Sequence, residues 1–300
     1  MSFYKNIGGM IRPSTRDELR HEIEIRLNRG QYNLNDIDTS KITDMNCLFT
    51  NFNMSDLRKI DISRWDVSNV VNMEGMFYSC INFNCDLSEW DVSNVVNMRQ
   101  MFAFCKEFNS DLSEWNIHNV KVTMEMFTGC VKFNSDLSKW DVSRVENMSY
   151  MFDNCTSFNS DLSKWDILRV RDTQSMFYNC REFNSDLSEW DTHNIKDMSF
   201  MFSYCWKFNS DLSKWDVSKV TDMRSMFTGC VKFNSDLSEW DISNVENMEG
   251  MFEECTNFNC DLSKWNPKKL RFYNLQNLFH NSGMKVIPKW YDTRSTPGVL

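Results

Sequence analysis

Tryptophan recurs at a fixed spacing of 25 residues through most of this chain of 300 residues. The ten positions are Trp65, Trp90, Trp115, Trp140, Trp165, Trp190, Trp215, Trp240, Trp265 and Trp290. A repeat of this length cannot bury its own apolar face, so copies stack and share one core. The spacing therefore predicts one elongated repeat body rather than the roughly two globular domains that the length alone suggests.

The start of the chain lies outside this pattern. Thr15 and Glu18 fit the capping box at the beginning of a helix, and Gly30 fits the residue that ends one. We therefore predict that residues 1–36 form an N-terminal helical cap, which covers one open end of the stack.

The remaining chain divides into three parts. These are a divergent first repeat at 37–65, eight regular 25-residue repeats at 66–265, and a divergent C-terminal repeat with a tail at 266–300. In the last part the pair Leu278-Phe279 is displaced by two positions from its equivalents, and the tail contains Thr296-Pro297-Gly298. Atypical end copies are expected in a capped stack, because an exposed end would aggregate.

One regular copy, residues 91–115, reads DVSNVVNMRQMFAFCKEFNSDLSEW. Its apolar residues Val95, Met98, Phe102 and Cys105 are spaced as on one side of a short helix. At the preceding junction, Leu87, Trp90 and Val92 fit the L-x-x-L-x-L pattern of a strand in a leucine-rich repeat. The predicted fold is an α/β repeat, a leucine-rich-repeat-like solenoid with one short parallel strand and one short helix per repeat.

The order of residues in each copy also carries a family resemblance. The pattern F-x-x-C-x-x-F-N-x-D-L-S-x-W-D-V-S-x-V-x-x-M-x-x-M-F recurs eight times between about Ile37 and Trp265. It resembles the branch of the BspA-like leucine-rich-repeat surface protein family that has 25-residue repeats. The resemblance implies an uncharacterised or adhesive repeat protein, of a kind found on bacterial surfaces and encoded by large DNA viruses.

Charge and hydropathy exclude several classes of partner. The net charge is −9, and Lys and Arg are scattered singly, so we expect no nucleic-acid partner. No apolar run reaches the length of about 18 residues that a membrane span needs, so we expect no membrane insertion. The first 20 residues do not fit a signal peptide, which predicts a protein that is not classically secreted and is cytoplasmic or virion-associated.

Eight cysteines occupy one repeat position and should form a column inside the stack. They are Cys80, Cys105, Cys130, Cys155, Cys180, Cys205, Cys230 and Cys255. A single-file column does not offer the tetrahedral geometry of zinc, so we interpret it as buried core. Cys85 and Cys260 replace Ser in the first and last regular copies, roughly 34 Å apart at strand spacing, which leaves only an intermolecular disulfide open to them.

Two acidic columns also run along the repeats. One contains Asp86, Asp111, Asp136, Asp161, Asp186, Asp211, Asp236 and Asp261, and the other follows each Trp from Asp66 to Asn266. Stacked carboxylates repel, so either a cation or local hydrogen bonds must offset the repulsion. No glycine pattern of calcium-binding repeats accompanies them, which favours Asx turns over cation binding.

We find no pattern that predicts catalysis or a bound cofactor. His118 and His193 share a repeat position but stand three copies apart, too far to hold one metal ion. No phosphate-binding loop, nucleophile elbow, dinucleotide fingerprint or zinc-hydrolase motif is present. We therefore expect a protein that is not an enzyme and needs no cofactor.

Aromatic residues gather at variable positions in the middle copies. Trp206 is the one tryptophan outside the 25-residue spacing, and Tyr150 stands at another variable position. Exposed aromatic residues anchor protein interfaces, although isolated ones also occur on ordinary surfaces. The candidate protein-binding residues are Tyr178, Phe200, Tyr204 and Trp206.

The near-identical copies favour a non-catalytic repeat scaffold that mediates protein–protein interaction. We expect it to be a structural component of a larger assembly such as a virion, with partner proteins whose identity the sequence does not reveal. The alternative is a surface adhesin or antigen that binds a host ligand.

Overall fold

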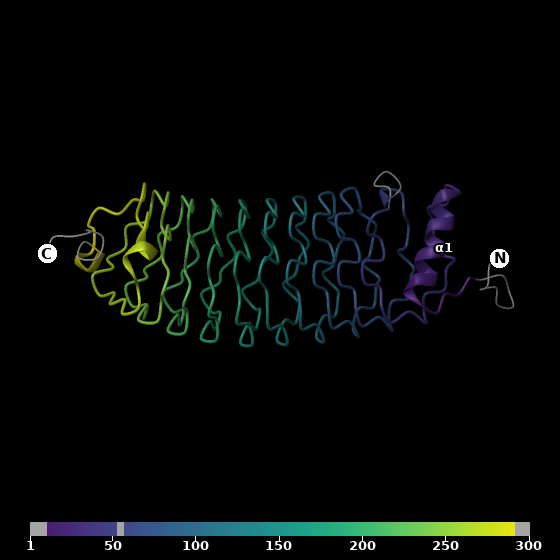
Figure 1. Cartoon of the computed structure of the whole chain (residues 1–300), viewed down its shortest axis with the longest axis horizontal. Coiled ribbons are helices and arrows are strands. Elements are labelled where there is room, and N and C mark those ends of the chain that lie inside the picture. Colours follow the sequence, from purple (N-terminus) through teal and green to yellow (C-terminus); the bar gives the residue numbers. More distant parts are fainter. Residues whose placement is uncertain (1–10, 53–56, 292–300) are drawn as a thin grey trace.

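The computed structural model describes residues 11–52 and 57–291, and it shows a stack of similar coils in one elongated body (Figure 1). Single parallel β-bridges join neighbouring copies, and the first of the regular series pairs Asp44 with Asn72, 28 residues away. Each later bridge, from Asn72 with Asn97 to Asp222 with Asn247, joins residues 25 apart. The tandem 25-residue repeats are therefore present as predicted, and the step from the first copy to the second is longer than the later ones.

The prediction of a helix in each regular repeat is wrong, because residues 66–265 form consecutive tight turns instead. The Cys105 N–H donates to the Phe102 carbonyl at 2.9 Å, whereas the Phe102 N–H donates to the Met126 carbonyl of the next copy at 2.9 Å. Turns closed by such three-residue bonds return the chain to the same face every three or four residues. An α-helix has the same period, which explains the wrong prediction.

The strand predicted at Leu87, Trp90 and Val92 is also wrong. The Trp90 N–H closes a turn on the Leu87 carbonyl at 3.1 Å, and no bridge forms there. The bridges lie further along each copy, at positions such as Asn97 and Val122. The regular repeats are therefore built of turns and single parallel bridges, and the α/β description does not apply to them.

Side chains supply many of the bonds between copies that strands would otherwise make. The Leu87 N–H donates to Ser110 Oγ at 2.9 Å, and the Leu87 carbonyl accepts from Trp115 Nε1 at 2.9 Å. The tryptophan bond recurs at every copy from Trp65 to Trp290. Each regularly spaced tryptophan thus ties its copy to the preceding one.

The core consists of aromatic columns that run along the stack. The rings of Phe102 and Phe108 stack within one copy at 4.0 Å, and Phe102 stacks on Phe127 of the next copy at 5.6 Å. The side chain of Trp115 closes the column and is 3% exposed. Every copy therefore buries its aromatic residues against those of both neighbours, as the repeat spacing predicts.

The helix α1 spans Arg16–Asn28 and covers the N-terminal end of the stack (Figure 1). Thr15 is its N-cap, with the Thr15 hydroxyl oxygen accepting from the Glu18 N–H at 3.2 Å. The Glu18 carboxylate accepts instead from the Ser14 N–H and hydroxyl, both at 2.8 Å, so only half of the predicted capping box forms.

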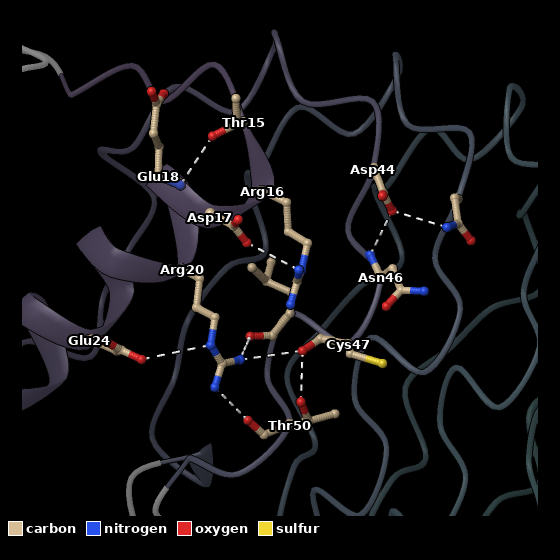
Figure 2. A network of polar contacts seen from close by, with 12 residues as sticks. Thr15, Arg16, Asp17, Glu18, Arg20, Glu24, Asp44, Asn46, Cys47 and Thr50 are labelled. Atoms are coloured by element: carbon tan, nitrogen blue, oxygen red, sulfur yellow. Dashed lines mark hydrogen bonds and ion pairs between the residues drawn. The ribbon is translucent and has the colours of Figure 1, made fainter.

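Arg20 of α1 satisfies backbone carbonyls at the end of the stack (Figure 2). Its guanidinium donates to the carbonyls of Cys47, Leu48 and Thr50 at 3.3, 2.6 and 2.8 Å. In the stack, the N–H groups of one copy donate to carbonyls of the next, as Phe77 does to Met101. Carbonyls of the first copy have no preceding copy to pair with, and a buried unpaired carbonyl is unfavourable. Arg20 therefore closes this end chemically as well as sterically.

At the other end the 3₁₀-helix η1, Phe272–Leu275, precedes the displaced pair Leu278-Phe279. The Phe252 N–H still donates to the Leu278 carbonyl at 3.0 Å, and the Phe252 and Phe279 rings stack at 5.9 Å. The displaced pair thus occupies the core positions of its equivalents. The predicted tail at Thr296-Pro297-Gly298 lies outside the described residues, among which no helix has the length and apolarity of a membrane span.

We predict that Trp165→Ala lowers the free energy of unfolding by about 3–5 kcal/mol, the range of large-to-small core substitutions. Trp165 is buried, and the substitution leaves the Leu137 carbonyl without its indole donor. Trp290→Ala should have a smaller effect, since Trp290 is half-buried at the end of the stack. Urea unfolding followed by circular dichroism measures both, and equal losses would contradict the stacked core.

Candidate functional site

The structure places Phe200 and Tyr204 at the two left-handed backbone positions of their copy, with φ of 57° and 60°. The same two positions are left-handed in every regular copy. Apart from Phe104 and Tyr204, the second position carries small or polar residues such as Gly129, Asn154 and Asn179. A bulky side chain in this conformation is strained by roughly 1–2 kcal/mol. The aromatic residues therefore stand where the fold favours glycine or asparagine.

Tyr204 is held between the copies before and after it. Its ring meets the ring of Tyr178 edge-on, with centroids 5.7 Å apart and an angle of 85°. On the other side it covers Gly229, where an added Cβ would lie 2.7 Å from Tyr204 Cδ1. Tyr204 remains 37% exposed, so the structure presents the ring rather than burying it.

The other two predicted residues each carry a guanidinium over the ring. Arg181 lies 4.4 Å from the Trp206 ring centroid, and Arg224 lies 5.0 Å from that of Phe200. Such cation–π contacts hold the rings in place. The structure thus brings Tyr178 and Tyr204 into contact, whereas Trp206 and Phe200 are each fixed by an arginine of a neighbouring copy.

A second aromatic pair was not predicted from the sequence. Tyr78 and Phe104 meet edge-on at 5.6 Å and 86°, and Phe104 covers Gly129 as Tyr204 covers Gly229. Tyr78 and Phe104 are 37% and 38% exposed. All three members of this arrangement stand 100 residues before their counterparts, a spacing of four copies that the sequence itself contains.

We call the aromatic residues of these two arrangements, together with the nearby Trp206, the aromatic ridge. It consists of Tyr78, Phe104, Tyr178, Tyr204 and Trp206. The members occupy three neighbouring repeat positions on the same side of the stack. The ridge therefore presents two similar aromatic platforms, and only the second includes a tryptophan, because Lys106 stands where its counterpart would be. The copies between them carry smaller side chains such as Thr128 and Asn154.

A chain of hydrogen bonds crosses the copies between the platforms. Asn154 Nδ2 donates to the Asp153 carboxylate at 2.7 Å, and Asn179 Nδ2 donates to Asn154 Oδ1 at 2.8 Å. Arg181 Nε then donates to Asn179 Oδ1 at 2.9 Å, which orients the guanidinium that lies over Trp206. Burial raises the pKa of Asp153 to about 7, and the nearby Glu125 adds to this effect.

The acidic columns form Asx turns, as the sequence favoured. In one column Asp111 Oδ1 accepts from the Ser113 N–H at 2.9 Å, and the same bond occurs in all eight copies. This bond lowers the pKa of Asp111. The carboxylates are thus stabilised as anions by the turns that they close.

A shallow polar groove of about 510 Å³ lies over two copies, on the acidic-column side. Its residues include Asn159, Ser160 and Asp161, whose oxygens already accept backbone N–H groups. These oxygens of the groove therefore stabilise the backbone of the stack. The groove also lacks the apolar walls that are typical of a ligand pocket.

The cysteine column is buried as predicted and also bonds between copies. Cys105 Sγ donates to the Phe77 carbonyl at 3.0 Å, and burial raises the pKa of these thiols, for Cys80 to about 12. Cys85 and Cys260 each accept a backbone N–H where other copies use Ser. All eleven cysteines are free thiols. The hydrogen bonds of the column and of Cys85 and Cys260 account for cysteine at these positions without a disulfide.

The histidines have local acidic partners. His118 Nδ1 lies 2.6 Å from the Asp141 carboxylate, and His193 Nδ1 lies 2.7 Å from that of Asp191. The pKa of Asp141 is lowered to about 2, mainly by the Ser143 hydroxyl and then by His118. In the part of the chain that the structure describes, no three His, Cys, Asp or Glu side chains are arranged to hold a metal ion.

A family model described as "Mycoplasma protein of unknown function, DUF285" matches the chain three times. The matches cover residues 23–130, 107–211 and 183–290, so together they include the whole repeat region. No match is found among curated proteins.

We predict that Gly229→Ala destabilises the protein more than Gly30→Ala does. Both glycines have positive φ, 71° and 69°, but an added Cβ at Gly30 meets no atom within 4 Å. Gly30→Ala should therefore show only the backbone strain, roughly 1–2 kcal/mol, whereas Gly229→Ala also displaces the Tyr204 ring. Urea unfolding gives both values.

The control combines each glycine substitution with Tyr204→Ala, which removes the ring. In that background the excess effect of Gly229→Ala should vanish, because only the backbone strain remains. An excess that persists without the ring would show that Gly229 does not serve to seat Tyr204.

We also predict that the protein loses stability as the pH rises from about 5 to about 8. The folded-state pKa of Asp153 is about 7, above the ordinary value of 3.8, so the folded state favours the protonated form. That contribution is present at low pH and is lost as Asp153 ionises, at a cost of roughly 2 kcal/mol. Asp153→Asn should remove this pH dependence in urea unfolding and stabilise the protein at the higher pH.

The control is Asp161→Asn, since the pKa of Asp161 is lowered by its bond from the Ser163 N–H. This variant should show no gain in stability at the higher pH. A gain of equal size at both positions would contradict the assignment to Asp153.

Proposed function

The chain belongs to the DUF285 family, and from this premise we propose that it is a non-catalytic repeat scaffold whose aromatic ridge binds other proteins. The observation that carries the proposal is the duplicated arrangement of Tyr178, Tyr204 and Gly229. It places exposed rings in a defined orientation twice along one side of the stack.

The cost of the arrangement supports a role in binding. Phe104 and Tyr204 occupy a backbone position with positive φ, and most of the equivalent positions carry Ser, Asn or Gly. The two rings stay partly exposed, so core burial does not offset the strain. Rigid, exposed aromatic side chains are the residues that most often anchor protein interfaces.

The more specific roles follow from the sequence pattern. We propose that the scaffold is a component of a larger assembly such as a virion, with the BspA-like leucine-rich-repeat branch as its closer family placement. A surface adhesin for a host ligand is the second function to which the same resemblance points. Both roles require the same exposed ridge, and they differ in whether the native partner lies inside the assembly or outside it.

Photo-crosslinking in the native setting tests the proposal. A photoreactive phenylalanine analogue replaces Phe104 or Tyr204 in turn, and in the control it replaces Glu114, an exposed residue on the groove side. We expect both ridge positions to crosslink to the same partner and the control position to give no such product. Equal crosslinking from all three positions would contradict a ridge-specific interface.

A further inference from the structure

We propose that the partner of the aromatic ridge is a second copy of this chain, packed antiparallel across a twofold axis. The axis passes through the copy at residues 141–165, midway between the two platforms. This inference rests on the proposed function, because it names the partner of that same surface. It follows from the symmetry of the ridge, the order of charges beside it and the straightness of the stack.

Symmetry is the first step. Phe104 and Tyr204 each stand 50 residues, two copies, from Asn154. In a twofold dimer the same surface serves both partners, and each contact occurs twice. An axis at Asn154 therefore places Phe104 of one copy opposite Tyr204 of the second copy, at both platforms at once.

The glycines fit the same arrangement. Tyr78 then faces the copy that contains Gly229, and Tyr178 faces the copy that contains Gly129. Both glycines are buried, Gly129 under the Phe104 ring and Gly229 under the Tyr204 ring of their own chain. The rings of one partner thus meet the rings that cover these glycines in the other.

Charge order is the second step. Along the ridge, Lys132 pairs with Glu107, and Lys207 pairs with Glu182. In both pairs the glutamate comes first in the chain. In the antiparallel dimer Glu107 faces Lys207 of the second copy and Lys132 faces Glu182 of the second copy, so each charge of these two pairs meets its opposite. A parallel, in-register copy would place Glu107 beside another Glu107.

The residues at the axis meet their own counterparts. Asn154, Thr156 and Ser157 are uncharged, and Asn154 and Thr156 are half-buried. The neighbouring carboxylate of Asp153 accepts from Asn154 Nδ2 within its own chain. The centre of the interface therefore holds polar groups that can approach their copies, with the aromatic contacts on either side.

The stack is straight enough for both platforms to make contact. From Phe102 to Phe202 the core rings of successive copies stay within 4° to 8° of parallel. At the spacing of neighbouring strands, four copies separate the platforms by roughly 20 Å. Figure 1 shows no sharp bend in this part of the stack.

The test exchanges charges without changing the net charge. Glu107→Lys with Lys132→Glu, the half exchange, keeps an opposite-charge pair within each chain. Across the proposed interface, however, positions 107 and 207 now carry like charges, as do positions 132 and 182. We expect the half exchange to raise the dimer dissociation constant at least about tenfold in sedimentation equilibrium of the full chain.

The full exchange adds Glu182→Lys and Lys207→Glu, which makes every facing pair opposite again. We expect it to restore dimerisation to within about threefold of the unmodified chain. Glu114→Lys with Lys139→Glu is the matched control, because this pair on the groove side has the same charge order. It should leave dimerisation unchanged.

Four results would overturn the inference. They are an unmodified chain that stays monomeric up to about 100 µM, a half exchange without effect, a full exchange that fails to restore the dimer, and a groove-side exchange that dissociates it. A monomeric chain that still crosslinks to another protein from Tyr204 would overturn only the identity of the partner. Crosslinking without preference for the ridge would overturn the proposed function itself.

Discussion

The indole N–H of each regular tryptophan donates to a backbone carbonyl of the preceding copy, and the stack depends on this bond. The acceptor is a leucine in every copy except that of Trp90, which donates to Ile62. Trp115 and Ser110 together satisfy both backbone groups of Leu87. The chain can therefore pass through tight turns, without a continuous strand, and still leave few buried backbone groups unpaired. The same tryptophan fills the space beside the phenylalanine columns, so one residue type provides both the packing and the connection between copies.

The sequence was sufficient to predict the stack and its core, because these depend on period and apolarity. It was not sufficient to predict the backbone within a copy. Consecutive turns closed on the third residue, as at Phe102 and Cys105, bring residues to one face with the period of a helix. Periodicity alone cannot separate the two. Turns are favoured over a helix by hydrogen bonds between copies, such as the one from the Phe102 N–H to the next copy. These bonds form only when the copies stack, so the sequence of a single copy does not reveal them.

The candidate site, too, was only partly predictable from the sequence. Tyr204 and Trp206 were identified from sequence because they depart from the polar residues at variable positions. Tyr78 and Phe104 lie in the first two regular copies and were missed, although their distance of 100 residues from the other pair is visible in the chain. The role of Gly229 required the structure, because it depends on a ring from the preceding copy lying over that backbone position.

A uniform stack also converts distance along the sequence into distance in space. Each copy contacts mainly its two neighbours, so a substitution at an exposed position changes the surface locally and leaves the remaining copies intact. The ridge is built in this way, from a few aromatic residues and two glycines set into an otherwise constant pattern. Since the platforms lie a whole number of copies apart, they face the same side. A partner with matching twofold symmetry can therefore engage both platforms together, which a single exposed ring could not achieve.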